Sequence, residues 1–350
     1  MNFEWLMESA DYPIKYSLTR DASYIAQIMD NEEVAMWLNK LVNRAAVSDF
    51  GGIHGSHDYR YENIIGKCYI LGLDANVPEF DSAVRFFVNF LDKHITDTYD
   101  DTLTFGKMYQ FRDYETILSC YLPLLGYADE KSVQYIAKKR ADIVYSFTSQ
   151  NRYDVYRSDL SYPGAKKEWK PFILDPALYA DGNIAFPSVH DLILFAGMYP
   201  HFDAETKNKV ETTIKWMFTD EYASINSQLY YYAPLDPAYK SKSINSKIGL
   251  HNFTNPNIKD MQSLLYYCFI FSHFSEAKNS IWFENAMAHL NSYKTTTGRY
   301  IFPKEMIREQ KDTYAHNGGH MNVGENKKSK NYAEVISTYW MEKILVNVNQ

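Results

Sequence analysis

The hydrophobic positions of this chain recur with the spacing of amphipathic helices along most of its length. One stripe falls at positions i, i+3, i+4 and i+7, namely Val84, Phe87, Val88 and Leu91. Residues 283–290 repeat this spacing, and residues 210–217 carry a narrower stripe with lysines on the opposite side. Other segments are apolar on nearly every side, which is typical of buried helices. They are residues 64–73, 117–125, 189–199 and 264–271.

The two kinds of segment alternate along the chain. We expect buried helices over residues 64–73, 113–127, 188–199 and 258–274, each followed by a one-sided helix over residues 81–94, 130–147, 204–218 and 277–293. Residues 332–346 are expected to form a last buried helix and residues 21–41 an outer one. Pairs of this kind, repeating about every 50 to 60 residues, predict an all-α fold: an α/α toroid of alternating inner and outer helices.

No change in composition marks a linker, so residues 1–350 are interpreted as a single α/α-toroid domain. Two long segments, residues 151–185 and 230–257, are rich in Tyr, Pro, Asn and Asp. Long irregular segments often serve as lids or binding loops, and we expect these loops at one rim of the toroid. Residues 298–303 are the best strand candidate, but they are too few to found a sheet.

The composition is ordinary for a soluble globular protein, with 46% hydrophobic and 23% charged residues. A net charge of −7 and the lack of a basic stripe argue against a nucleic-acid partner. The longest apolar run, residues 264–271, is too short to span a bilayer, and the N-terminus does not resemble a signal peptide. Cys68, Cys120 and Cys268 lie in apolar runs and are interpreted as buried free thiols. These features predict a cytoplasmic protein without a membrane partner, and they leave the oligomeric state undefined.

Two polar, glycine-rich loops, residues 51–63 and 314–325, each run into an apolar helix. They carry four of the chain's 10 histidines. Glycine lets backbone approach a ligand closely, histidine titrates near neutral pH, and polar loops on a rigid scaffold commonly carry chemistry. We therefore interpret the two loops as the rim of an active site. Because both precede helices assigned to the inner ring, we expect them to meet at the same end of the toroid and share a cavity.

The first loop offers a proton shuttle, a carboxylate to orient it and a cation to hold an anion. In the structural alternative, Asp58 caps the helix that begins near Tyr59, and Glu62 pairs with a neighbour. The candidates from this loop are the catalytic residues His57 and Asp58 and the substrate-binding residues His54, Tyr59 and Arg60.

In the second loop, His316 and His320 are four positions apart, a spacing that brings two zinc ligands to one face of a helix. Two glycines between them argue against a helix. We therefore favour a catalytic role for His320 with Glu325 and a substrate-binding role for His316, and the alternative is a glycine turn with a satisfied histidine. We expect no metal. A zinc site would require His54 or His57 to meet one of these histidines together with a carboxylate such as Asp58 or Glu325.

A third candidate region is the start of the buried helix near residue 188. Ser188 and Asp191 fit a variant of the capping box, which explains both residues structurally. His190 is not explained by capping and is a candidate catalytic residue, while Asp191 remains a candidate for substrate binding. Tyr231, in a run of three tyrosines, is a candidate aromatic contact to substrate, with loop packing as the alternative.

The chain resembles bacterial proteins of the terpenoid cyclase and protein prenyltransferase toroid superfamily. The resemblance lies in the helical pairs and in two local elements, Thr297-Gly298-Arg299-Tyr300 after one hairpin and residues 319–325 before the last helix. It implies the toroid fold. The Asp-x-Asp-Asp motif of class II cyclases is not matched, because residues 97–102 place one residue too many between the first two aspartates. The Asp-x-Cys element that holds zinc in prenyltransferases is absent. Site residues are therefore not transferred from either activity.

Three functions fit these observations. The first is an enzyme that uses acid–base residues at the toroid mouth for isomerisation, cyclisation or elimination on a small, partly apolar substrate. It needs no cofactor, because no nucleotide-binding or zinc-helix motif is present. The second is a carbohydrate-active hydrolase or lyase on an (α/α)6 barrel, in which Asp58 faces Asp191 or Glu325. The third is a non-catalytic binding toroid, which has no need of a histidine or carboxyl group with a displaced pKa.

Overall fold

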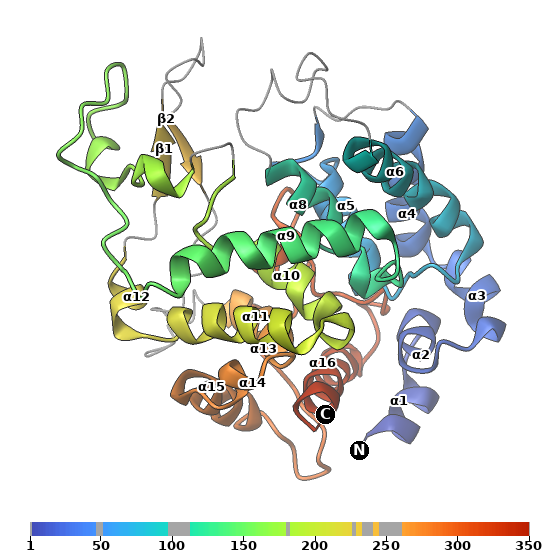
Figure 1. Cartoon of the computed structure of the whole chain (residues 1–350). Coiled ribbons are helices and arrows are strands. Elements are labelled where there is room, and N and C mark those ends of the chain that lie inside the picture. The colour runs from blue at the N-terminus through green and yellow to red at the C-terminus, as the bar shows by residue number, and fades with distance from the viewer. Residues whose placement is uncertain are drawn as a thin grey trace.

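The computed structural model describes residues 2–46, 52–96, 113–179, 183–225, 229–232, 241–244 and 261–349, and these residues are mostly helical (Figure 1). The helices of the first half are α1 (Phe3–Ser9), α2 (Tyr12–Thr19), α3 (Ile25–Met29), α4 (Glu32–Ala46), α5 (Tyr61–Ile70), α6 (Pro78–Thr96), α8 (Asp113–Ser119) and α9 (Lys131–Thr148). The second half contains α10 (Val189–Met198), α11 (Ala204–Met217), α12 (Asp220–Ser224), α13 (Met261–Phe271), α14 (Ser275–Lys278), α15 (Ile281–Asn291) and α16 (Tyr332–Val348). The all-α prediction is confirmed.

The strands of the described chain are β1 (Leu229–Tyr232) and β2 (Ser241–Ile244), which pair antiparallel with Leu229 opposite Ile244. They lie in the second Tyr-rich segment, whereas residues 298–303 form only an isolated bridge between Lys294 and Tyr300. The strand candidate was therefore wrong. A turn at Gly298, whose φ is +85°, brings the chain back on itself at this bridge, and the pairing extends no further.

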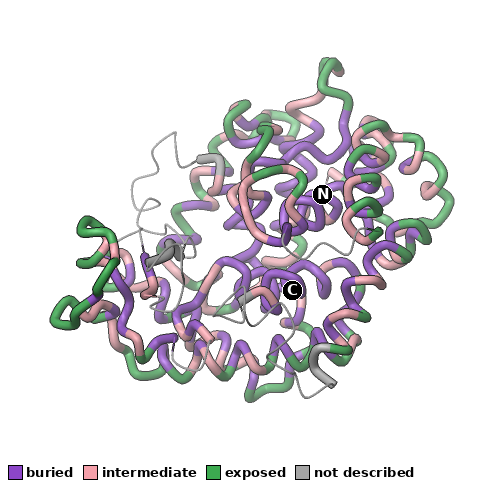
Figure 2. The backbone as a smooth tube through the Cα atoms, turned by 90° about the horizontal axis from the view of Figure 1, so that it is seen from above, coloured by how far each residue is buried: buried purple, intermediate pink, exposed green. Residues whose placement is uncertain are grey.

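Burial follows the predicted alternation. Every residue of α10 except Gly197 is buried, and so is every residue of α5 except Tyr69. In contrast, α9 and α11 bury one side and expose the other. Viewed from above, buried residues occupy the middle of the molecule and exposed residues its outline (Figure 2). One hydrophobic core extends along the chain from Leu6 to Ile344.

The N-terminal region differs from the prediction of one outer helix over residues 21–41. The structure has a short turn, Ala22–Tyr24, then α3, a break, and α4. The break occurs because the Asn31 side-chain oxygen accepts hydrogen bonds from the backbone N–H groups of Glu33 (3.1 Å) and Val34 (3.2 Å). An asparagine in this role starts a new helix rather than continuing the previous one.

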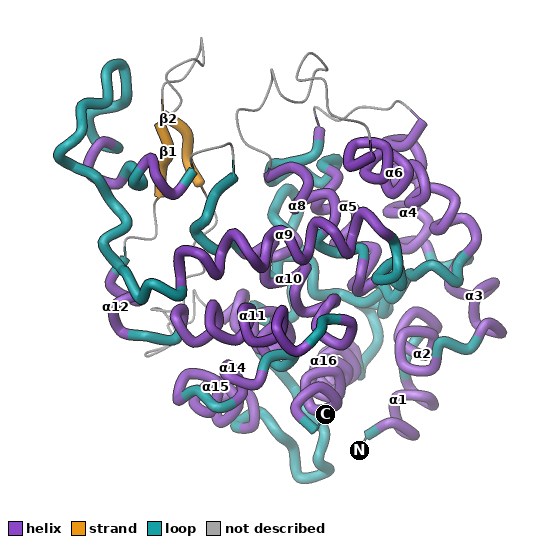
Figure 3. The backbone as a smooth tube through the Cα atoms, in the orientation of Figure 1, coloured by secondary structure: helices purple, strands orange, loops and turns teal. Residues whose placement is uncertain are grey.

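Packing around α5 is close enough to require glycine. A Cβ atom at Gly66 would lie 2.7 Å from Ala315 Cβ and 2.9 Å from the Tyr121 ring. Ala315 opens the 3₁₀ turn η9 (Ala315–Asn317), so Gly66 lets α5 press directly against the second polar loop. The helices and the long loops that connect them are distinguished in Figure 3.

Cys68, Cys120 and Cys268 are free and buried, as expected. Across the described ranges, no helix combines the length and the apolar character needed to cross a bilayer. The first Tyr-rich segment has short 3₁₀ turns and a small apolar cluster of its own, formed by Tyr162, Ile173 and Tyr230. Residues 233–240 and 245–257 of the second segment lie outside the described residues, so its role as a lid stays a prediction.

Candidate functional site

The two polar loops meet at the N-terminus of α5, and Asn63 joins them. The Asn63 side-chain amide donates to the carbonyls of Gly55 (2.8 Å) and His57 (3.0 Å), and its oxygen accepts from the N–H of Ala315 (3.1 Å). Nearby, Asp58 accepts a hydrogen bond from the N–H of Asp312 at 2.8 Å. The predicted approach of the two loops is therefore confirmed.

A buried carboxylate, Glu62, lies at the centre of the first polar cluster. His190 Nε2 is 3.0 Å from Glu62 Oε2, and His54 Nδ1 is 2.8 Å from Glu62 Oε1. The N–H of Gly55 donates to the same Oε1 at 2.6 Å. His316 Nδ1 lies 4.0 Å from Oε2, and its ring meets that of His190 edge-on at 5.1 Å between centroids. Four residues from three separate parts of the chain thus converge on one point: His54 and Glu62 from the first polar loop and the start of α5, His190 from α10 and His316 from η9.

The surroundings of this cluster favour the charged form of Glu62 and the neutral form of His316. Burial tends to raise the pKa of Glu62, but hydrogen bonds from His190 and His54 outweigh it and hold that pKa well below its usual value. Burial lowers the pKa of His316 to about 3, and the nearby His190 acts in the same direction. Near neutral pH the cluster therefore contains an ionised carboxylate beside a neutral imidazole, both of which present lone pairs.

On the α10 side, hydrogen bonds and an ion pair at the start of the helix hold the cluster in place. Ser188 and Asp191 form a capping box at the start of α10, as predicted, and Asp191 also makes a two-point ion pair with Arg140 at 2.7 and 3.1 Å. His190, the second residue of the helix, is thereby fixed in direction. The capping box and Arg140 engage both carboxylate oxygens of Asp191, so the structure places Asp191 in the scaffold rather than facing Asp58.

A second cluster surrounds the fully buried Lys67 on the same helix. The Lys67 ammonium group contacts Glu309 at 2.8 Å, Glu33 at 2.9 Å and the carbonyl of Asn322 at 2.6 Å. Burial tends to lower the pKa of Lys67, but the two carboxylates outweigh it and raise that pKa above its usual value. The buried charge is therefore balanced within the network.

Glu309 links this network to His320. Burial tends to raise the pKa of Glu309, but the charge of Lys67 and the hydrogen bond with His320 lower it to about 2. His320 Nδ1 is 2.6 Å from Glu309, and Nε2 is 3.2 Å from the carbonyl of Thr313 and 3.8 Å from Asp58. Both ring nitrogens of His320 therefore face oxygen atoms that can accept a hydrogen bond.

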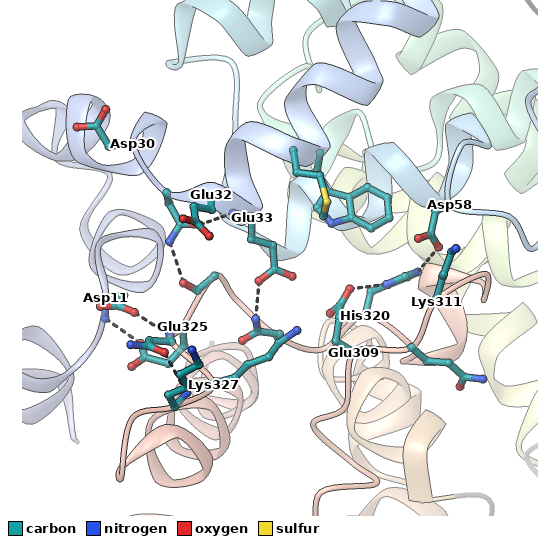
Figure 4. A pocket seen from close by; sticks show the side chains of 18 residues that line it. Asp11, Asp30, Glu32, Glu33, Asp58, Glu309, Lys311, His320, Glu325 and Lys327 are labelled. Carbon is teal, nitrogen blue, oxygen red and sulfur yellow. Dashed lines mark hydrogen bonds and ion pairs between the residues drawn. The ribbon is translucent and has the colours of Figure 1, made fainter.

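Glu33, Asp58, Glu309, His320 and Asn322 line an open cleft of about 810 Å³, with Lys67 behind this lining. Its lining includes seven carboxylic acids, three lysines, Trp37 and Met36. The two polar loops therefore share a cavity, as expected. Figure 4 places Glu325 beside Asp11 at one end of the cleft, Glu309, His320 and Asp58 at the other end, and Glu33 between them.

Glu325 differs from the other carboxyl groups in this cleft. Burial raises its pKa to about 7, which the hydrogen bond from the Asp11 N–H at 2.8 Å only partly opposes. A carboxyl group with such a pKa is partly protonated near neutral pH and can donate a proton. Glu309, in the same cleft, stays ionised.

The remaining predicted site residues lie on the outside of the first loop or elsewhere. His57 is exposed, stacks on Tyr59 and lies 3.3 Å from Asp312. The Arg60 guanidinium packs over the Tyr59 ring, and neither residue belongs to the described lining of the cleft. Tyr231 lies on β1 against Tyr179. Residues 97–102, the near match to the cyclase motif, fall outside the described chain.

Sequence reasoning missed the central residues of both clusters, Glu62 and Lys67, and the partners Glu33 and Glu309. A signal for Lys67 was present in the sequence. It is the one charged residue in residues 64–73, a segment that is otherwise apolar on nearly every side. A charge inside a buried helix requires a partner of opposite charge. Glu62 was noted only as a residue that pairs with a neighbour. No protein-family model, curated protein or solved structure matches the chain.

Proposed function

We propose that the protein is an enzyme that performs general acid–base chemistry on an uncharged, hydroxyl-rich substrate, of which a carbohydrate is the main example. The observation that carries this proposal is the difference between two carboxyl groups in one cleft. Glu325 has a pKa of about 7 and Glu309 a pKa of about 2. Carboxyl groups whose environments push their pKa values apart are a common feature of acid–base active sites.

The scaffold we propose is the α/α toroid. The buried helices α5, α8, α10, α13 and α16 contact one another in chain order, and so do the outer helices α4, α6, α9, α11, α14 and α15. Two parallel series of neighbours of this kind are what a toroid of helical hairpins requires. The polar cleft would then lie at the end of the toroid where α5 begins.

The charges around the cleft support an uncharged substrate. Three of its seven carboxylic acids are paired with cations inside the wall: Glu33 and Glu309 with Lys67, and Asp58 with Lys40 at 3.6 Å. Three more lysines also line the cleft, Lys311 near Asp58 and two others at positions 327 and 328. The acids are therefore largely balanced by cations, and the polar groups that remain suit hydroxyls.

Two reaction classes were predicted, and the lining supports the carbohydrate-active one. Most of the lining residues are polar or charged, and Met36 and Trp37 are its large apolar side chains. Of the two carboxylate pairs considered, Asp58 with Glu325 lines the cleft, whereas Asp191 is held by Arg140. We assign Glu325 as the proton donor and the carboxylates at the opposite end, Glu309 and Asp58 on either side of His320, as its partners.

The test is product analysis with a panel of oligosaccharides and polysaccharides. Hydrolysis releases reducing ends, and elimination produces an unsaturated sugar. On a substrate that is turned over, Glu325→Gln should lower kcat by about 10²- to 10⁴-fold, the usual contribution of a general acid. Glu305→Gln changes an exposed carboxyl group outside the cleft and should leave kcat unchanged.

Equal rates for the wild type and Glu325→Gln would contradict the proposed role of Glu325. A rearranged product of unchanged mass would favour an isomerase. A sugar that binds in the cleft and is recovered unchanged after long incubation would favour the non-catalytic binding protein.

A further inference from the structure

The cluster around Glu62 is separate from the acid–base pair of the cleft, and its donor atoms have a chemistry of their own. One ligand atom from each of His54, Glu62 and His190 lies within 4.8 Å of the others. We propose that these three residues bind a divalent first-row transition-metal ion. The proposal does not rest on the function proposed for the cleft.

The donor set is the first argument. Two imidazoles and one carboxylate form a common ligand set for zinc and for ferrous iron. In a tetrahedral site with ligands about 2.1 Å from the metal, neighbouring ligand atoms lie about 3.4 Å apart. His190 Nε2 lies 3.0 Å from Glu62 Oε2 and His54 Nδ1 lies 2.8 Å from Glu62 Oε1, so the two imidazoles approach the two oxygens of one carboxylate. Small side-chain rotations therefore suffice to admit an ion.

The second argument is that other residues hold these ligands in place. The Gly55 N–H donates to Glu62 Oε1, and Asn63 holds the backbone that follows His54 through the carbonyls of Gly55 and His57. His190 is held by the capping box at the start of its helix. Outer contacts of this kind orient metal ligands and are expected at a built metal site.

The third argument is access. The Glu62 side chain is 1% exposed and that of His190 is 9% exposed, whereas that of His54 is 36% exposed. The site is thus closed on its inner side and reached from solvent past His54. His316 Nδ1, 4.0 Å from Glu62 Oε2, is placed to act as a fourth ligand or to support His190. Three protein ligands with an open position are typical of catalytic rather than structural zinc sites.

The experiment uses the full chain purified without a histidine tag, stripped with a chelator and titrated with Co²⁺. We expect visible d–d absorption that saturates at one Co²⁺ per chain and is abolished by competing Zn²⁺. Elemental analysis should give the same stoichiometry for Zn²⁺, and metal should raise the melting temperature, since a ligand that binds the folded state stabilises it. Absence of saturable Co²⁺ absorption in the wild-type chain would overturn the proposal.

Single substitutions identify the ligands. His54→Ala and His190→Ala should each weaken Co²⁺ binding by more than about 100-fold, because loss of even a supporting contact costs 10- to 100-fold. His57→Ala removes the exposed histidine three positions away and should bind like the wild type. His54 is the partly exposed ligand, so His54→Ala should retain the helical circular dichroism of the wild type.

His54→Cys provides a second check, since a thiolate replaces one ligand with another and should restore binding with a shifted cobalt spectrum. Wild-type affinity in both His54→Ala and His190→Ala would contradict the assignment. Glu325→Gln should leave Co²⁺ affinity unchanged, so failure of the cleft proposal and failure of the metal proposal are separable.

Discussion

Helix α5 carries the centres of two buried networks of opposite character. Glu62, in its first turn, is an anion surrounded by His54, His190 and His316. Lys67, five positions later, is a cation enclosed by Glu33 and Glu309. Five positions correspond to a rotation of about 140° around a helix. One short helix therefore directs one charge toward α10 and η9 and the other toward α4 and the segment before α16.

The two networks differ in whether they can take up a further ligand. The Lys67 ammonium group has three N–H donors, and three oxygen atoms lie within hydrogen-bonding distance, so this network is complete. Around Glu62, one imidazole nitrogen each of His54 and His190 faces the carboxylate, and in the metal site that we propose these nitrogens bind the ion instead. The Lys67 network thus leaves its ammonium group no N–H for a further ligand, whereas the Glu62 cluster holds ligand atoms that an ion can bring together.

The largest expected effect comes from removing the cation of the complete network. Lys67→Met removes the shared ion-pair partner of the partly buried Glu33 and Glu309 and should lower the free energy of unfolding by about 3–5 kcal/mol. Chemical denaturation measures this loss. The matched control is Lys40→Met, which removes a partly exposed lysine 3.6 Å from Asp58 and should cost at most about 1 kcal/mol. Equal losses for the two variants would show that the Lys67 network is not a special source of stability.

An intermediate effect is expected at Asn63, whose side chain joins the two loops beside the Glu62 network. Asn63→Ala leaves the carbonyls of Gly55 and His57 and the N–H of Ala315 without these hydrogen bonds. The expected loss is about 2–3 kcal/mol, measured by the same denaturation experiment. Asn208→Ala, at an exposed position of α11, should change the free energy of unfolding by less than about 0.5 kcal/mol. A loss for Asn63→Ala as small as that of the control would indicate that the loops hold together without Asn63.

The smallest effect concerns the pH dependence contributed by Glu325 at the cleft. Its pKa is about 7 in the folded protein, against an ordinary value of 4.5. Between these two values the folded state keeps a proton that the unfolded chain has lost. The raised pKa therefore contributes fully to the free energy of unfolding below pH 4.5, and this contribution is lost as the pH rises through 7. The charged or titratable groups that face Glu325 are Asp11 and Lys15 from the α2 region and Tyr332 from α16.

Glu325→Gln imitates the protonated carboxyl group at every pH. Its melting temperature should equal that of the wild type near pH 5 and exceed it near pH 8, where the wild type must hold a buried carboxylate. Glu305→Gln, at an exposed position, should show no such trend between pH 5 and pH 8. A difference between Glu325→Gln and the wild type that is the same at both pH values would contradict the raised pKa.

Helix positions and burial were predictable from local pattern. The alternation of buried and one-sided segments predicted α5, α6, α9, α10, α11 and α15 within a few residues. The break at Asn31 was missed, because the hydrophobic period continues across it and only the capping hydrogen bonds reveal it. The approach of the two loops followed from helix direction, since both loops precede helices with buried faces.

The partners within each network depended on the tertiary structure alone. Lys67 and Glu309 are 242 positions apart, and His190 and Glu62 are 128 positions apart. Hydrophobic periodicity reports which side of a helix avoids water, and that information is local. The choice of partner for a buried charge depends on which segments the packed core brings together. The chain alone therefore determined that α5 is buried and that histidines flank it, whereas the folded core decided that Glu62 meets His54 and His190 and that Lys67 is enclosed by Glu33 and Glu309.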